Sequence, residues 1–184
     1  DVIMMAEAEI TKLTNNNLAV KISEENVPNY SHIYDTFRDD YFVPQISSAG
    51  VLIYNTEKVN PAPTSWGALW DPQYKGKVGM LETNRYFNMF VGASIAGEEY
   101  YRNQRWDEVS WDNLAKLKSD MDLKIYSTQE ALGNAMASGE IYMTVGWRAR
   151  AKTWSENEVG EPIASVLPEE GCYVYLSGAA VLAN

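Results

Sequence analysis

The stretch between Pro61 and Val78 constrains the fold of this chain more than any other, because it predicts a turn, a short helix and a strand in that order. Two prolines keep its start extended, and Thr64 or Ser65 can cap a helix that follows at once. The apolar side chains of that helix recur at helical spacing, at Trp66, Leu69 and Trp70.

A strand is predicted on each side of this helix. Asp71-Pro72 stops the helix, Gly76 permits a turn, and the apolar run Val78–Leu81 is typical of a buried strand. Upstream, Gly50–Asn55 predicts another strand that ends at a polar turn residue. The order strand, loop, helix, strand indicates an α/β fold.

The rest of the chain continues the alternation. Strands are predicted at 1–5, 123–126, 141–145 and 163–166, and helices or helical turns at 10–13, 31–38, 85–96 and 110–121. Gly97 is expected to end the helix that begins at Arg85. The pattern Ser127-Thr-Gln-Glu130 predicts a capping box for one more helix, whose apolar face holds Leu132, Ala135 and Met136.

Composition and charge limit the classes of function that this chain can have. The chain has 184 residues, 46% hydrophobic content, a formal charge of -10 and a pI near 4.6. Such an acidic chain is a poor partner for nucleic acid, because phosphate backbones require clustered Lys and Arg. Its apolar runs are far shorter than the ~20 residues of a membrane span. The single cysteine, Cys172, excludes an internal disulfide.

The sequence does not contain a set of residues in the pattern of an enzyme active site. The only histidine, His32, lies in a polar segment without a serine or cysteine in a nucleophile-elbow context. Cys172 has no second cysteine at metal-binding spacing, and Gly76-Lys-Val-Gly79 lacks the Lys-Ser/Thr ending of a phosphate loop. We therefore expect no catalytic residue, no metal site and no cofactor.

Several blocks of sequence resemble one family in their order and spacing. They are Tyr41–Pro44, Gly50–Asn55, the Ser65-Trp66 and Tyr74–Lys77 blocks, Gly139–Trp147, Gly160–Ile163, Leu167–Gly171 and Ala179–Asn184. Together they resemble the periplasmic solute-binding proteins of ABC importers, particularly the spermidine/putrescine-binding group. The resemblance implies a class II periplasmic-binding-protein fold, which is α/β.

The same resemblance implies that the chain is the middle of a receptor, mainly its second lobe with part of the first. Residues 1–46 would be the partial first lobe, 47–174 the second lobe, and 175–184 the return segment to the first lobe. Family members begin with a strand and helix before the position of Asp1 and continue with helices beyond that of Asn184. Uncovered sheet edges would then favour self-association.

Aromatic and polar positions of the family predict the ligand contacts. Trp147, expected after a turn at Gly146, and Tyr175 fall where relatives use aromatic platforms, which hold an organic cation or cover an apolar part of a ligand. Core packing is the alternative for both. The family's polyamine-binding carboxylates fall on Ser177, Asn84 and Phe87, so all three negative charges are missing here.

Other residues can compensate for, or replace, those carboxylates. Glu7 and Glu82 follow predicted strands, although a solvated surface charge is an equally good interpretation. Thr83, Asn84 and Arg85 stand where a helix should begin, which favours a carboxylate, phosphonate or sulfonate; a surface salt bridge is the alternative for Arg85. Arg148 and Arg150 flank Trp147 but would face different ways on one helix. Ser47, near the expected hinge, is a lesser candidate.

The resemblance thus predicts a non-catalytic receptor in the periplasm or outside the cell. It would capture a small polar solute, such as a polyamine-like amine, a zwitterion or a small organic anion, and deliver it to an ABC permease. The permease would be its only link to the membrane. Two alternatives stay open, namely a ligand-sensing module of a larger protein and, less favoured, an enzyme on the same fold.

Overall fold

The chain divides into two compact units in the computed structural model, which describes residues 1–103, 105–156 and 162–183. Unit 1 comprises Asp1–Ser48 and Val174–Asn184, and unit 2 comprises Ala49–Tyr173. The chain therefore passes between the units twice. The assignment of 1–46, 47–174 and 175–184 to family lobes stays a prediction.

Unit 1 is a small sheet with a helix on one face. Its elements are β1 (Val2–Ala6), α1 (Glu7–Asn15), the 3-10 turns η1 (Tyr30–His32) and η2 (Asp35–Phe37), the start of β2 (Val43–Asn55), and β7 (Val174–Val181). β1 pairs antiparallel with β7, which in turn pairs with β2. Ile10 of α1 packs with Phe42 and Ala180 in its core, so the covered face of the sheet is the one toward α1.

Unit 2 holds a mixed sheet. Its strands are the remainder of β2, β3 (Val78–Leu81), β4 (Lys124–Tyr126), β5 (Met143–Trp147) and β6 (Ile163–Val166). β2 lies between β5 and β6 and is antiparallel to both, whereas β3 is parallel to its neighbours β4 and β5. Parallel pairs need crossover connections, and helices supply them here. The predicted α/β class is confirmed.

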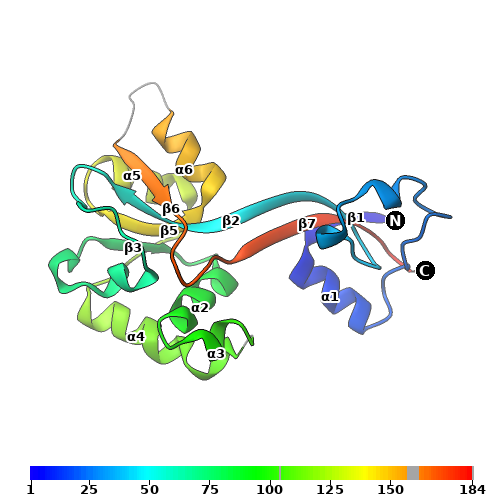
Figure 1. Ribbon diagram of the computed structural model, residues 1–184, viewed down its shortest axis with the longest axis horizontal. Helices are drawn as coiled ribbons and strands as arrows, with labels where there is room; N and C mark the ends of the chain where they lie inside the picture. The colour runs from blue at the N-terminus through cyan, green and yellow to red at the C-terminus, as the bar shows by residue number, and fades with distance from the viewer. Residues whose placement is uncertain (104, 157–161, 184) are drawn as a thin grey trace. The chain divides into compact units, whose positions relative to one another are not determined.

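Helices cover both faces of this sheet (Figure 1). Among them are η3 (Trp66–Trp70), η4 (Pro72–Tyr74), α2 (Arg85–Ser94), α3 (Glu98–Tyr101), η5 (Trp106–Glu108), α4 (Ser110–Asp120), α5 (Gln129–Ala137) and α6 (Arg148–Ser155). Helices α2, α3 and α4 lie on one face, and α5 and α6 lie on the other. Unit 2 is therefore a three-layer arrangement.

Strand β2 contributes to both apolar cores of unit 2. Leu52 and Tyr54 belong to the core beneath α2 and α4, while Val51 and Ile53 belong to the core beneath α5 and α6. Successive side chains of a strand point to opposite faces, so a strand covered on both sides must be apolar without interruption. This explains the continuous run of apolar residues that predicted the strand.

The structure corrects two local predictions. Gly146 does not form a turn, because it lies inside β5 opposite Val51, where a Cβ atom would lie 2.6 Å from Cδ1 of Ile53. A larger residue here would therefore require the end of the Ile53 side chain to shift. The helix α5 is capped by Thr128, which accepts a hydrogen bond from the Ala131 amide at 3.1 Å, and not by Ser127 as the capping-box pattern predicted.

Other boundaries moved by a few residues. α2 ends at Ser94, α1 extends over Glu7–Asn15, and β2 begins at Val43, well before Gly50. The early part of β2 lacks an apolar pattern because Gln45, Ile46 and Ser47 are exposed. Gly160 and Glu161, which begin one of the family-like blocks, and Asn184, which ends another, lie outside the described residues. Within the described ranges no helix is long and apolar enough to cross a membrane.

Candidate functional site

The predicted site residues of unit 2 gather at one edge of its sheet. β3 and β5 run parallel, so their carboxyl ends point the same way. Thr83, Asn84 and Arg85 follow β3 and open α2, and Trp147 is the last residue of β5. Thr83 and Arg85 are exposed, whereas Asn84 and Trp147 are partly buried. Ligands of open α/β sheets bind at this edge.

Three aromatic rings adjoin that edge, and we call them the aromatic triad: Phe87, Trp147 and Tyr173. The ring centroids of Phe87 and Trp147 are 5.2 Å apart, and Tyr173 stacks on Phe87 at 6.0 Å with an interplanar angle of 15°. Trp147 and Tyr173 are 6.1 Å apart. Phe87 is only 1% exposed, so it forms a buried base for two partly exposed rings.

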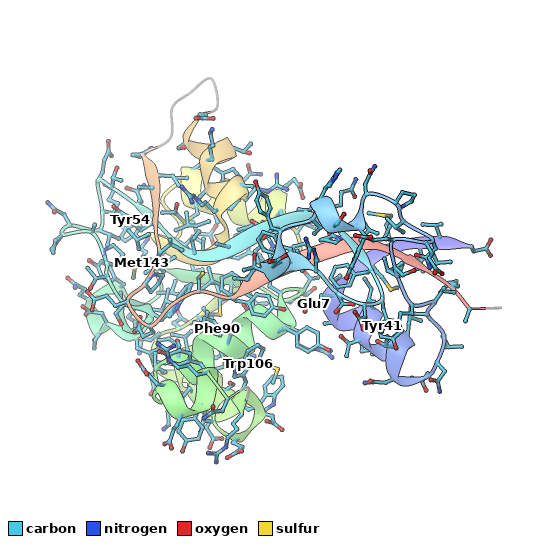
Figure 2. All side chains as sticks on the ribbon, turned by 45° about the vertical axis from the view of Figure 1, so that its right-hand side comes forward. Glu7, Tyr41, Tyr54, Phe90, Trp106 and Met143 are labelled. Carbon is cyan, nitrogen blue, oxygen red and sulfur yellow. The ribbon has the colours of Figure 1, made fainter. Side chains whose placement is uncertain are left out.

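The triad continues into the core through further edge-to-face contacts. Phe90 and Trp106, labelled in Figure 2, have centroids 5.9 Å apart, and Trp106 lies 5.9 Å from Tyr173. Trp66 packs edge-on against Phe87 at 5.7 Å. Such aromatic pairs add roughly 0.5–1.5 kcal/mol each beyond their buried area, so the base of the triad is held firmly.

Sequence reasoning missed Tyr173 and the packing role of Phe87. It selected Tyr175 as the aromatic residue of the return segment, and that role stays a prediction. The ring of Tyr173 lies 6.1 Å from that of Trp147 in unit 2. The position of Phe87 in α2 offered a signal, since a phenylalanine in a helix that packs on a sheet must find apolar neighbours. Glu82, the suggested compensating charge, is exposed just after β3.

Polar atoms at the start of α2 carry no hydrogen bond from the described part of the chain. They are the side-chain Nδ2 of Asn84 and Oδ1 of Asn88, both buried as atoms. Asn84 is the residue before the helix and its side chain does not cap it, while Nδ2 of Asn88 donates to the Leu81 carbonyl at 2.9 Å. The first amides of α2 thus retain the capacity to donate to a ligand.

Arginines lie at the starts of two helices near this edge. Arg85 begins α2, and Arg148 begins α6 directly after Trp147; both are exposed. Arg150 is partly buried two positions further on. A cation at a helix start is unfavourable with respect to the helix dipole, so both sites favour the approach of an anionic group.

The remaining predicted residues belong to unit 1. Ser177 of β7 is 7% exposed and pairs with Ala6, so Glu7, the exposed first residue of α1, follows directly after that pair (Figure 2). Tyr175 is partly buried two positions earlier in β7, and Ser47 is exposed in β2. The eight predicted residues thus form two sets, one in each unit, and their shared role in ligand binding stays a prediction.

Residues considered for catalysis have ordinary surroundings. His32 is exposed on η1, and burial raises the pKa of the Cys172 thiol, which disfavours the reactive thiolate. In the residues that the structure describes, no group of three or more His, Cys, Asp or Glu side chains is placed to hold a metal ion.

A titratable cluster lies elsewhere, beside the edge strand β4. The Tyr126 hydroxyl donates to Glu140 at 2.9 Å, and Lys124 Nζ lies 3.3 Å from the same carboxylate. Burial and the hydrogen bond to Glu140 raise the pKa of Tyr126 to about 12. The hydrogen bonds from Tyr126 and Lys124 lower the pKa of Glu140. This cluster ties β4 to the loop before β5.

Comparison with known proteins gives one consistent family. The family model described as bacterial extracellular solute-binding protein matches residues 1–184. The spermidine/putrescine-binding periplasmic protein of Escherichia coli is 23% identical over 193 residues, covering 100% of this chain and 54% of that protein. Iron uptake protein A2 of Synechocystis is 31% identical over 147 residues, covering 74% of this chain and 41% of that protein.

A solved structure shares the fold. The substrate-binding protein PotD of a spermidine/putrescine ABC transporter from Streptococcus pneumoniae superposes with a TM-score of 0.76 at 19% identity, covering 99% of this chain and 57% of that one. The likeness confirms the class II periplasmic-binding-protein fold. The chain spans about half the length of the curated relatives it matches.

Proposed function

Because the chain belongs to the bacterial extracellular solute-binding proteins, we propose that it captures a small organic solute and delivers it to an ABC permease. The observation that carries this proposal is the aromatic triad beside the start of α2, at the carboxyl edge of a parallel strand pair. The proposed site of action is the periplasm or the cell exterior, and the proposed role is binding without chemical turnover.

The aromatic triad supports an organic ligand with an apolar body. The partly exposed rings of Trp147 and Tyr173 can cover such a body or hold a cationic group by cation–π attraction, worth about 0.5–2 kcal/mol depending on desolvation. Relatives carry the names of polyamine and iron proteins, and ring faces suit the organic class better than a bare metal ion.

The polar groups of α2 support an anionic end on the same ligand. Thr83, Asn84 and Arg85 can donate to a carboxylate or sulfonate, and the first amides of the helix add a favourable dipole. A zwitterion, or an amine with an apolar body, therefore fits at least as well as a polyamine. Glu7, Ser47, Tyr175 and Ser177 remain predicted contacts from unit 1.

Self-association is a further proposed property of this chain, and the free edge of β1 supports it. Among the described strands β1 pairs with β7 alone. The Leu182 amide donates to the Asp1 carbonyl, so the backbone groups of Asp1 point toward the strand β7. Because the direction of these groups alternates along a strand, those of Val2, Met4 and Ala6 point away from β7. This edge carries no charge and no proline, and Val2 is 69% exposed, so it can pair with a second copy.

Native mass spectrometry of the purified chain tests the proposal. Spermidine, glycine betaine and taurine serve as probes for an amine, a zwitterion and a sulfonate. We expect at least one of them to add its mass to the wild type and to be lost from Trp147→Ala. Trp111→Ala removes an exposed tryptophan of α4 and should retain the solute. Equal retention by both variants, or no added mass, would contradict the proposed site; a changed solute mass would indicate an enzyme.

A further inference from the structure

Residues 167–173, the last stretch of unit 2 before the chain leaves it, are fastened to the start of η3. The Glu170 carboxylate accepts hydrogen bonds from the Ser65 hydroxyl and from the Trp66 amide, the latter at 3.3 Å. The Trp66 indole Nε1 donates to the Gly171 carbonyl at 2.9 Å. These bonds join positions about a hundred residues apart, and Glu170 accepts two of them.

A backbone bond strengthens this connection. The Glu169 amide donates to the Thr64 carbonyl at 2.8 Å. The Ser65 hydroxyl, while donating to Glu170, also accepts from the Gly67 amide at 2.9 Å and so caps η3. Each bond of such a chain polarises the next, and the carboxylate at its end makes the bonds charge-assisted.

The anchor of this connection is rigid. Trp66 is completely buried, and its ring packs edge-on against Phe87 at 5.7 Å and Phe90 at 6.4 Å. Its indole and its backbone amide both face the segment 167–173. The segment is therefore held against a side chain that cannot move without disturbing the aromatic core.

Tyr173 lies two residues after Gly171 and is held through both its side chain and its backbone. Its ring stacks on Phe87, and its carbonyl accepts from the Gly50 amide at 2.7 Å. Gly50 and Tyr173 each stand within two residues of a border of unit 2. The path of the chain from Glu170 thus decides where the Tyr173 ring lies in the aromatic triad.

We propose that Glu170 is a positioning residue, which fixes Tyr173 in the aromatic triad by tying its segment to Ser65 and Trp66. The effect of Glu170 on solute binding rests on the proposed function, whereas the hydrogen bonds that hold the segment do not. Loss of the carboxylate leaves the Ser65 hydroxyl and the Trp66 amide without this acceptor, so the segment opens more often.

Amide hydrogen exchange by NMR tests the inference without any solute, so its failure is distinct from failure of the proposed function. In Glu170→Ala, the Gly50 amide should exchange roughly tenfold faster or more, the ratio expected for a lost charge-assisted bond. The Asn55 amide lies in the same strand as Gly50 and donates to the Tyr142 carbonyl at 2.9 Å, and its exchange rate should stay unchanged. The Trp66 indole signal should shift as its bond to Gly171 weakens.

Two variants complete the design. Glu169→Ala removes the neighbouring, exposed carboxylate and keeps the backbone amide, so the Gly50 rate should stay unchanged. Ser65→Ala removes one donor and should speed Gly50 exchange by a smaller factor; it is the decisive variant if Glu170→Ala does not fold by circular dichroism. An unchanged Gly50 rate, or an equal rise at Gly50 and Asn55, would overturn the positioning role.

Discussion

Replacing Gly50 by alanine tests how tightly the base of the aromatic triad is packed. A Cβ atom at this position would lie 2.6 Å from Cζ and 2.7 Å from Cε2 of Phe87. Carbon atoms prefer separations of about 3.5–4.0 Å, so the ring must move by about 1 Å. Phe87 is 1% exposed and borders Trp66, Trp147 and Tyr173, which leave it no simple way to yield.

Two opposing terms set the magnitude. Overpacking of a well-filled core costs about 1–3 kcal/mol. Alanine lowers the conformational entropy of the unfolded chain relative to glycine, which stabilises the folded protein by about 0.4–1 kcal/mol where alanine can adopt the backbone conformation. The net expectation for Gly50→Ala is a loss of about 1–2 kcal/mol in the free energy of unfolding.

Urea unfolding followed by tryptophan fluorescence measures this loss, because all six tryptophans lie in unit 2. The midpoint should fall while the slope stays unchanged. Phe87→Leu provides room for the new methyl group, so in the Phe87→Leu background the alanine should cost less by at least about 0.5 kcal/mol. A Gly50→Ala variant as stable as the wild type, or strictly additive effects, would refute the packing argument.

Two further predictions concern the α5 cap and the β4 cluster. Thr128→Ala should destabilise unit 2 by about 1 kcal/mol, because the Ala131 amide loses its acceptor, whereas Ser127→Ala should leave the urea midpoint unchanged; equal effects would contradict the observed cap. Tyr126 has its pKa raised to about 12 through burial and Glu140, so the stability this group contributes is complete below about pH 10 and is lost as the pH rises through 12. Stability of Tyr126→Phe, measured by urea unfolding between pH 10 and 12, should therefore decline less steeply than that of the wild type, and parallel declines would contradict the assignment.

Local sequence patterns predicted the strands and helices of unit 2 well. The strand Val78–Leu81 was predicted at its observed bounds, because a strand covered on both faces is a short, continuous apolar run between turn residues. The Ser65 cap of η3 was one of two residues proposed for that position. Boundaries were less certain where a strand is exposed, as in the first residues of β2, since exposure removes the apolar signal.

The site was predicted only in part. Trp147 was selected through the family resemblance and Thr83–Arg85 through their place at the start of a predicted helix. The parallel pairing of β3 with β5 brings both to one edge. The role of Tyr175 in ligand binding stays a prediction. Tyr173 was not selected, because nothing in its local sequence distinguishes it from Tyr175. Its selection depends on the ring of Phe87, which lies far away along the chain.

The sequence by itself determined the α/β class and most of the local structure, because periodicity, turn residues and caps act over a few neighbouring positions. The family followed from blocks of sequence that resemble its members in order and spacing. Only the tertiary structure decided that Phe87 lies beneath two partly exposed rings, that Gly146 lies inside a strand against Ile53, and that Glu170 binds Ser65 and Trp66. Each of these depends on atoms from distant segments meeting at van der Waals or hydrogen-bond distance. Strand register and core packing determine these long-range contacts, and local sequence patterns do not predict them.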